Sequence, residues 1–153
     1  MSGTFYNSKV LSIDLSGMKT DNVIDMSYMF ESCRNLISLN LTNFNTSNVR
    51  NMRYMFSNCV LLIYIDLSYF NTSNVNNMEY LFVGCNTLTS LNLSPFNTSS
   101  VINMNSMFQN CEALIKLDLS NFNTHNVKEL KNIFSGCLEL ISIDLSSFDT
   151  SLV

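Results

Sequence analysis

The chain has 153 residues and a formal net charge of −4 at pH 7, and 46% of its residues are hydrophobic while 13% are charged. A chain this apolar can bury a core, which excludes a disordered tail, and its 8 lysines and arginines are too scattered for a nucleic-acid-binding face. The longest apolar run, Val60 to Ile65, is far shorter than the roughly 20 residues that span a bilayer, so no transmembrane segment is expected. Asparagine and serine are in excess, whereas glycine and proline are scarce.

The first nine residues do not follow the pattern that organises the rest of the chain. They contain no apolar core segment, so no signal peptide is expected there. We expect residues 1–9 to form a partial N-terminal cap and residues 10–153 to form the repeats of a single domain, residues 1–153.

A constant period, equal to the interval from Cys33 to Cys59, marks these repeats. It carries five cysteines and five phenylalanines in constant phase: Cys33, Cys59, Cys85, Cys111 and Cys137, and Phe44, Phe70, Phe96, Phe122 and Phe148. Thr20, Thr46, Thr72, Thr98, Thr124 and Thr150 hold another phase. Because no copy gains or loses a residue, the pattern indicates one solenoid without an internal linker.

Each copy is predicted to begin with a short strand. Leu36, Leu39 and Leu41 have the L-x-x-L-x-L spacing of a leucine-rich repeat. Alternation predicts an inward set and an outward set of side chains. The inward set is Ile37, Leu39 and Leu41, and the outward set is Ser38, Asn40 and Thr42.

A polar corner and a helical segment are predicted to follow. At the corner we expect a stacked phenylalanine spine at Phe44 and a hydrogen-bonded amide ladder at Asn45. The helical spacing of Met52, Met55 and Phe56 then predicts one or two turns of helix. Asn51 is a candidate N-cap, and Asn58, like Gly84, Asn110 and Gly136 in later copies, is a candidate left-handed residue at the helix end.

The sequence therefore predicts an α/β fold, a leucine-rich-repeat solenoid of about six rungs of 26 residues. A parallel β-sheet forms one face, and short helices or helical turns form the other. We use the word rung for one copy of the repeat.

Three segments carry a resemblance to a known family. They are MSYMFESC (Met26 to Cys33), LISLNLTNFNTSNV (Leu36 to Val49) and FNTSNVRNM (Phe44 to Met52). They resemble the BspA-like leucine-rich repeats, and most closely the 26-residue variety of mycoplasma-type surface lipoproteins, over residues 10–153. The resemblance implies a virulence-associated module of a cell-surface or secreted protein that mediates adhesion or protein binding.

No catalytic, cofactor or metal site is predicted. The five cysteines are expected to be buried and reduced, because in-register side chains run parallel and do not close to disulfide geometry. His125 occupies a corner position that is serine in most copies, and no nucleophile–base pair or phosphate loop is present. Calcium at the adjacent Asp118 and Asp144 would lack further oxygen ligands.

The outward face of the sheet is the candidate binding surface. Its central row, which we call the acidic row, is Asp14, Asn40, Asp66, Asn92, Asp118 and Asp144. The candidate binding residues are Asp14, Ser38, Asn40, Tyr64, Asp66, Asn92, Lys116, Asp118 and Asp144. Two interpretations stay open: a solvated face that keeps the sheet soluble, or a platform for a cationic or polyhydroxylated partner, protein or glycan.

The function predicted first is a non-catalytic protein-binding or adhesion module of a surface protein. The sequence stops at Val153, where another helix would begin, and this leaves two expectations. The chain is cut from a longer protein, or a second copy covers its end. The second expectation gives the alternative function, a structural protein that associates head to tail into a filament.

Overall fold

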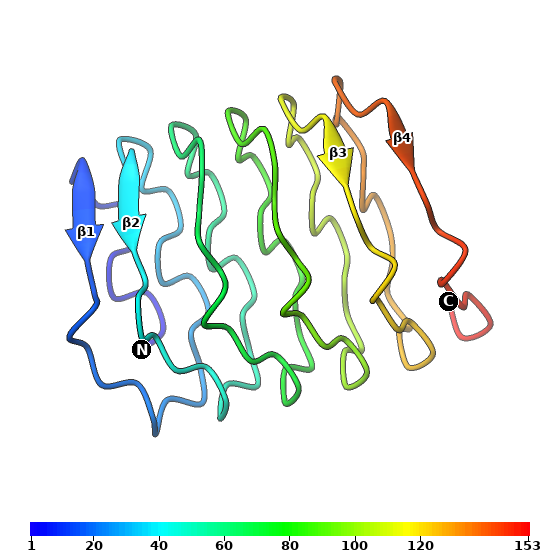
Figure 1. Cartoon of the computed structure of the whole chain (residues 1–153), viewed down its shortest axis with the longest axis horizontal. Coiled ribbons are helices and arrows are strands. Elements are labelled where there is room, and N and C mark those ends of the chain that lie inside the picture. The colour runs from blue at the N-terminus through cyan, green and yellow to red at the C-terminus, as the bar shows by residue number, and fades with distance from the viewer.

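The computed structural model describes residues 1–153, and the rungs follow one another along a single axis (Figure 1). β1 (Ser12–Asp14) pairs in parallel with β2 (Ser38–Asn40), and β3 (Lys116–Leu117) pairs in parallel with β4 (Ser142–Ile143). The register joins residues one rung apart, such as Ile13 to Leu39. Between these pairs only a bridge from Ser90 to Lys116 continues the ladder. The parallel face is therefore present, as two separate two-stranded sheets.

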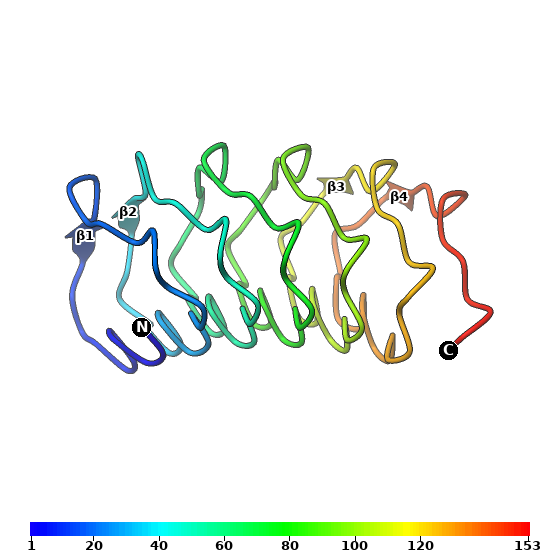
Figure 2. The ribbon, with the colours of Figure 1, turned by 90° about the horizontal axis from the view of Figure 1, so that it is seen from below.

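The predicted helices are absent, and a stack of tight turns takes their place on the side opposite the strands (Figure 2). In the first rung the N–H of Met29 donates to the carbonyl of Met26, and that of Cys33 to Phe30. The third residue of each turn is left-handed, with φ of 58° at Tyr28 and 57° at Ser32. No helix in the structure could cross a membrane.

Hydrogen bonds between rungs explain why turns replace the helix. The N–H groups of Met26, Tyr28, Phe30 and Ser32 donate to the carbonyls of Asn51, Arg53, Met55 and Ser57, with N···O distances of 2.8–3.0 Å. A helix would use the same groups within its own segment. Met52, Met55 and Phe56 are fully buried. The helical spacing therefore predicted the buried face correctly and the backbone wrongly.

The predicted left-handed residues are confirmed, although they end turns rather than helices. Positive φ occurs at Asn58, Gly84, Asn110 and Gly136, with values of 56°, 70°, 58° and 76°. A Cβ atom added at Gly84 would lie 2.5 Å from Oδ1 of Asn58 in the preceding rung. Asn110 occupies the same space next to Gly136. Asparagine and glycine therefore alternate because each asparagine side chain fills the space that the next glycine leaves.

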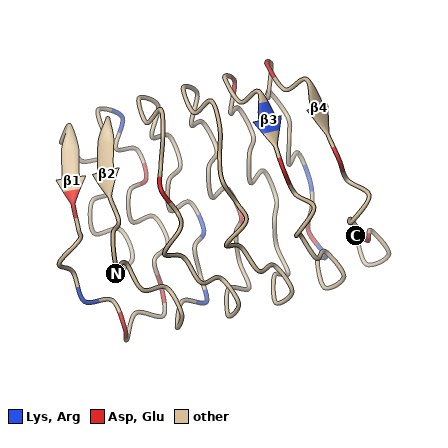
Figure 3. Cartoon of the chain, in the orientation of Figure 1, with Lys and Arg blue, Asp and Glu red and all other residues tan.

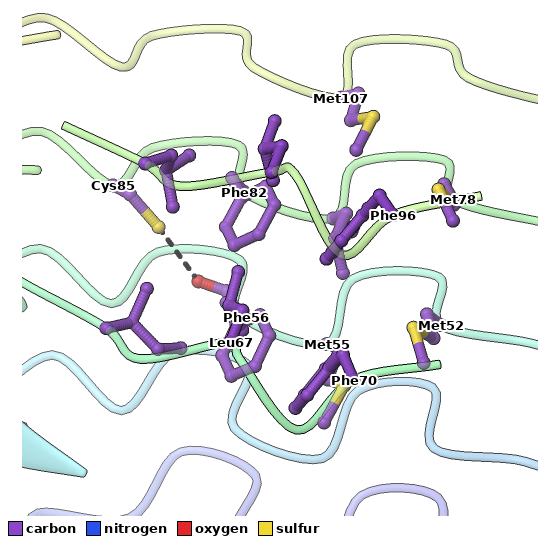
Figure 4. Close-up of a cluster of buried hydrophobic side chains, with 14 of the residues drawn as sticks. Met52, Met55, Phe56, Leu67, Phe70, Met78, Phe82, Cys85, Phe96 and Met107 are labelled. Carbon is purple, nitrogen blue, oxygen red and sulfur yellow. Dashed lines mark hydrogen bonds between the residues drawn. The ribbon is translucent and has the colours of Figure 1, made fainter. Parts of the chain in front are cut away.

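A core of 39 buried side chains runs along the solenoid axis (Figure 4). Phe56 and Phe82 stack with a centroid separation of 5.5 Å, and Phe30, Phe108 and Phe134 extend the column. The five cysteines are free, and all but Cys137 are buried, as predicted. The Cys85 thiol donates to the carbonyl of Phe56, with Sγ···O of 3.1 Å. Burial raises the pKa of Cys85 well above its ordinary value, and that of Cys111 to about 12.

Threonine hydroxyls join the rungs at the corner, as do side-chain amides such as that of Asn74, which donates to the carbonyl of Ser47. The Thr72 hydroxyl donates to the carbonyl of Asn97 (2.9 Å) and accepts from the N–H of Asn97 (2.8 Å). The predicted amide ladder does not run from asparagine to asparagine in the Asn45 phase, although Nδ2 of Asn45 donates to Oδ1 of Asp21 in the preceding rung. Oδ1 of Asn45 accepts the N–H of Ser47, and Asn71, Asn97 and Asn123 make the same local bond. The phenylalanine spine is present where Phe70 stacks on Phe44 and on Phe96.

Residues 1–8 repeat the turn segment in a shifted register. Gly3 and Asn7 have positive φ, like Tyr28 and Ser32, the corresponding residues of the next turn segment. Phe5 stacks on Phe30 with a centroid separation of 5.6 Å, and its N–H donates to the carbonyl of Met29. The turn pattern of the later rungs therefore continues into residues 1–8, but each residue there lies one position later than the repeat period predicts.

Candidate functional site

The nine predicted binding residues lie on the strand-bearing face. Ser38 and Asn40 belong to β2, and Lys116 belongs to β3. Figure 3 shows acidic residues recurring near the same end of the strands. Eight of the nine residues are exposed, and Asn40 is half-buried. The structure therefore brings them together on one solvent-facing surface, and their role in binding stays a prediction.

Every member of the acidic row caps the backbone that follows it. Oδ1 of Asp66 accepts the N–H of Ser68 at 2.9 Å, and Oδ1 of Asn92 accepts the N–H of Ser94 at 3.1 Å. The same bond occurs at Asp14, Asn40, Asp118 and Asp144. Because aspartate and asparagine both make it, the cap needs the side-chain oxygen and does not need the charge.

Hydrogen bonding favours the ionised form of three carboxyl groups in this row. The N–H of Ser120 lowers the pKa of Asp118, and that of Ser146 lowers the pKa of Asp144. The Asp144 charge opposes the lowering at Asp118 but is the smaller influence. The Ser16 N–H likewise lowers the pKa of Asp14. These three carboxyl groups are therefore charged at neutral pH.

Two shallow hollows lie on this face in the later rungs. One, of about 130 Å³, lies between Asn92 and Asp118. The other, of about 260 Å³, is lined by Lys116, Asp118 and Asp144. Nowhere does the structure group three or more His, Cys, Asp or Glu side chains that could hold a metal ion. The hollows fit side chains of a partner better than a small molecule, because a ligand pocket is usually deeper and more apolar.

The sequence interpretation missed a row of exposed apolar side chains beside the acidic row. The row, which we call the apolar row, consists of Leu11, Ile37, Ile63, Ile115 and Ile141, with exposed fractions of 60%, 53%, 57%, 43% and 80%. Ile37 was predicted to point inward, and this is wrong. Leu36 already fills the inward position, and β2 begins only at Ser38, so Ile37 faces solvent. The sequence does carry a signal for this. In the adjacent pairs Leu36–Ile37 and Leu62–Ile63 only one residue of each pair can point inward, so the other is left exposed.

A tyrosine stack on the turn side is a second cluster that the sequence did not predict. Tyr54 stacks between Tyr28 and Tyr80, with centroid separations of 5.2 and 4.5 Å. Arg53 lies 4.9 Å from the Tyr54 ring centroid and forms an ion pair with Glu79, with Nε···Oε2 of 2.7 Å. Arg53 thus contacts both a ring and a carboxylate, and the ring faces within the stack are covered. The cluster therefore stabilises neighbouring rungs.

His125 pairs with a carboxylate of the next rung, and this contact is an ion pair only when the imidazole is protonated. Its Nδ1 lies 3.0 Å from Oδ2 of Asp149 at an exposed corner. This hydrogen bond is the largest influence on Asp149 and lowers its pKa to about 2. The pair links the last two rungs at the corner.

Comparisons with known proteins give one family match and resemblances to solved structures. A family model described as "Mycoplasma protein of unknown function, DUF285" matches residues 1–86 and again residues 60–153. A leucine-rich repeat protein of T. pallidum has 17% identity and a TM-score of 0.45, over 91% of this chain and 69% of its own. One from Bacteroides ovatus has 21% identity and a TM-score of 0.45, over 86% of this chain and 40% of its own. A search of curated proteins found no match.

Proposed function

This chain belongs to the DUF285 family of mycoplasma proteins, and we propose that it is a protein-binding module whose strand-bearing face makes the contact. The finer part of the proposal is that the module serves adhesion at a cell surface. The resemblance of MSYMFESC and FNTSNVRNM to repeats of surface lipoproteins supports that part.

The observation that carries the proposal is that the charge of the acidic row is not needed by the fold. Asn40 and Asn92 make the same caps as Asp66 and Asp118 without any charge. Four of the six positions nevertheless carry a carboxylate on an exposed surface. Charge complementarity across an interface gives specificity and faster association, so these charges suit recognition of a partner.

The test replaces Asp66, Asp118 and Asp144 with asparagine. The caps survive this change, because asparagine already makes them in two rungs, so the variant should fold. We call the rows of Ser12, Asp14 and Ser16, with their equivalents in later rungs, the strand rows. A matched variant with the same change in charge carries Glu31→Gln, Glu112→Gln and Glu129→Gln, none of which lies in the strand rows. Binders are selected for the wild-type chain from a displayed random-peptide library, and a glycan array is screened in parallel.

The proposal expects peptide binders that lose at least about tenfold in affinity for the aspartate variant and keep their affinity for the glutamate variant. Equal affinity for both variants would contradict it. Binding to the glycan array alone would also contradict it and would favour the polyhydroxylated partner.

Head-to-tail association of the chain stays the alternative. Leu138 and Leu152, in the last two rungs, are 75% and 50% exposed and would pack against a second copy. Light scattering over a range of concentrations tests this, because a filament grows in mass with concentration. A constant mass of 17.4 kDa would rule the filament out.

A further inference from the structure

We propose that the strand-bearing face binds a cationic amphipathic α-helix that lies along the solenoid axis. The apolar stripe of the helix packs on the apolar row, and its lysine or arginine flank faces the acidic row. This inference rests on the proposed function and names the partner of the same face.

The apolar row is what sets this surface apart from a merely solvated sheet face. Five large aliphatic side chains are 43–80% exposed in one phase of the repeat, and only Thr89 interrupts them. Hydrogen bonds from the N–H of Ile37 to Leu11 and from that of Ile141 to Ile115 hold neighbouring members one rung apart. An exposed apolar strip with a polar border is typical of a protein-interaction surface.

The spacing along the axis fits a helix. Parallel strands lie about 4.8 Å apart, so the five intervals of the apolar row span about 24 Å. A helix advances about 5.4 Å per turn and covers that length in about 16 residues. The advance per helical turn is therefore close to the spacing between rungs, so a helix with one apolar side chain per turn places about one of them on each rung. An extended partner strand repeats its side chains on one side every ~6.6 Å and loses register with the rungs sooner.

The lateral spacing fits as well. Each acidic-row residue follows its apolar-row residue by three positions, as Asp66 follows Ile63, which is at most about 10 Å of extended chain. A helix with its side chains is about 10–12 Å across, so a flank that borders the apolar stripe lies over the acidic row.

Charge and an aromatic anchor complete the match. The strand rows of this face carry four aspartates, Asp14, Asp66, Asp118 and Asp144, against the single cation Lys116. This excess of negative charge favours a basic flank on the partner. Tyr64 lies between the two rows and is 66% exposed. Tyrosine in such a position is a common source of binding energy in interfaces.

The experiment uses a defined probe, a fluorescein-labelled peptide of about 18 residues with leucines along one helical stripe and lysines along one flank. Two control peptides carry glutamate in place of lysine, or a central proline in the same composition. Binding is measured by fluorescence anisotropy at about 50 and about 300 mM NaCl, because screening weakens exposed ionic contacts.

Three variants of the chain separate the two rows from the rest of the surface. One carries Ile37→Ser, Ile63→Ser and Ile115→Ser, and another carries the three aspartate-to-asparagine changes described above. The control carries Ile24→Ser and Ile102→Ser, which are 59% and 46% exposed outside the strand rows. The isoleucines replaced in these variants are all exposed, so both isoleucine variants should fold.

We expect the lysine peptide to bind the wild-type chain and the control variant alike, and each row variant at least about tenfold more weakly. The salt dependence should largely disappear in the aspartate variant. Equal binding of the glutamate or proline peptide would overturn the inference, as would unchanged binding by either row variant. A concentration-dependent dimer of the wild-type chain that the isoleucine variant abolishes would also overturn it, because a second copy would then be the occupant.

The inference and the proposed function can fail separately. If library peptides bind this face but share neither basic residues nor helical spacing, the face binds proteins and the inference about the helix is wrong. If neither the library nor the lysine peptide yields a binder that the aspartate variant weakens, both are wrong.

Discussion

The threonine ladder allows a stability prediction in which the number of hydrogen bonds is varied at one phase of the repeat. Thr72, which is fully buried, makes two bonds to the backbone of Asn97. Thr20 makes only the bond to the carbonyl of Asn45, and Thr150 is exposed and makes neither. Valine has nearly the shape of threonine without the hydroxyl, so each Thr→Val change removes these bonds and little else.

The expected losses follow from the bond count. Each intramolecular hydrogen bond contributes about 1 kcal/mol net, and leaving a partly buried partner unsatisfied costs about 1–3 kcal/mol. Thr72→Val should therefore lower the free energy of unfolding by about 2–4 kcal/mol and Thr20→Val by about 1–2 kcal/mol. Thr150→Val should change it by less than about 0.5 kcal/mol.

Urea unfolding followed by tyrosine fluorescence measures these differences. With a denaturant slope of about 2 kcal/mol per molar, the Thr72→Val midpoint should fall by about 1–2 M. Thr72→Ser keeps the hydroxyl and should lose much less stability. The reasoning is refuted if Thr72→Ser is as unstable as Thr72→Val, or if the three valine variants have equal midpoints.

Three further predictions concern a thiol, a backbone position and an ion pair. Cys85 should resist a thiol reagent at pH 8 in the folded chain and react on unfolding, because burial raises its pKa. Mass spectrometry measures the labelling, and rapid labelling of Cys85 in the folded chain would contradict this. Gly84→Asn should destabilise the chain by about 1–3 kcal/mol, since its side chain meets Asn58. Adding Asn58→Gly should restore only part of that stability in the same melt, because the new side chain at position 84 still competes with Asn110 in the following rung. By NMR, Asp149 should titrate at about 2, and closer to its ordinary value of 3.8 after His125→Gln. The stability that this pair adds is present above pH 3.8 and is lost as the pH falls towards 2.

The repeat, its parallel strands and its buried residues could be predicted because they depend on periodicity. The constant phase of Cys59 and Phe56 indicated stacking, and both are fully buried. The turn side could not be predicted from spacing, since consecutive tight turns bring residues three apart onto one face much as a helix does. What decides between them is the bonding of Phe30 N–H to Met55 in the next rung, a contact between separate copies of the repeat that no local pattern contains.

For the candidate site, the exposure of the acidic row could be predicted and its capping role could not. Alternation placed Asp66 outward correctly, but its bond to the N–H of Ser68 depends on how the chain bends after the strand. Ile63 was overlooked for a different reason. Alternation assumes that the strand extends back to this residue, whereas β2 in the equivalent rung starts one position later, at Ser38.

The asparagine-over-glycine packing gives the solenoid a parity. Removing one internal rung would bring Asn58 next to Asn110, with two side chains competing for one space, or Gly84 next to Gly136, with a void between them. Removing two rungs would restore the alternation, and it would also preserve the alternation of Asp66 with Asn92. Shortened or lengthened versions of this protein should therefore tolerate changes in pairs of rungs far better than single ones.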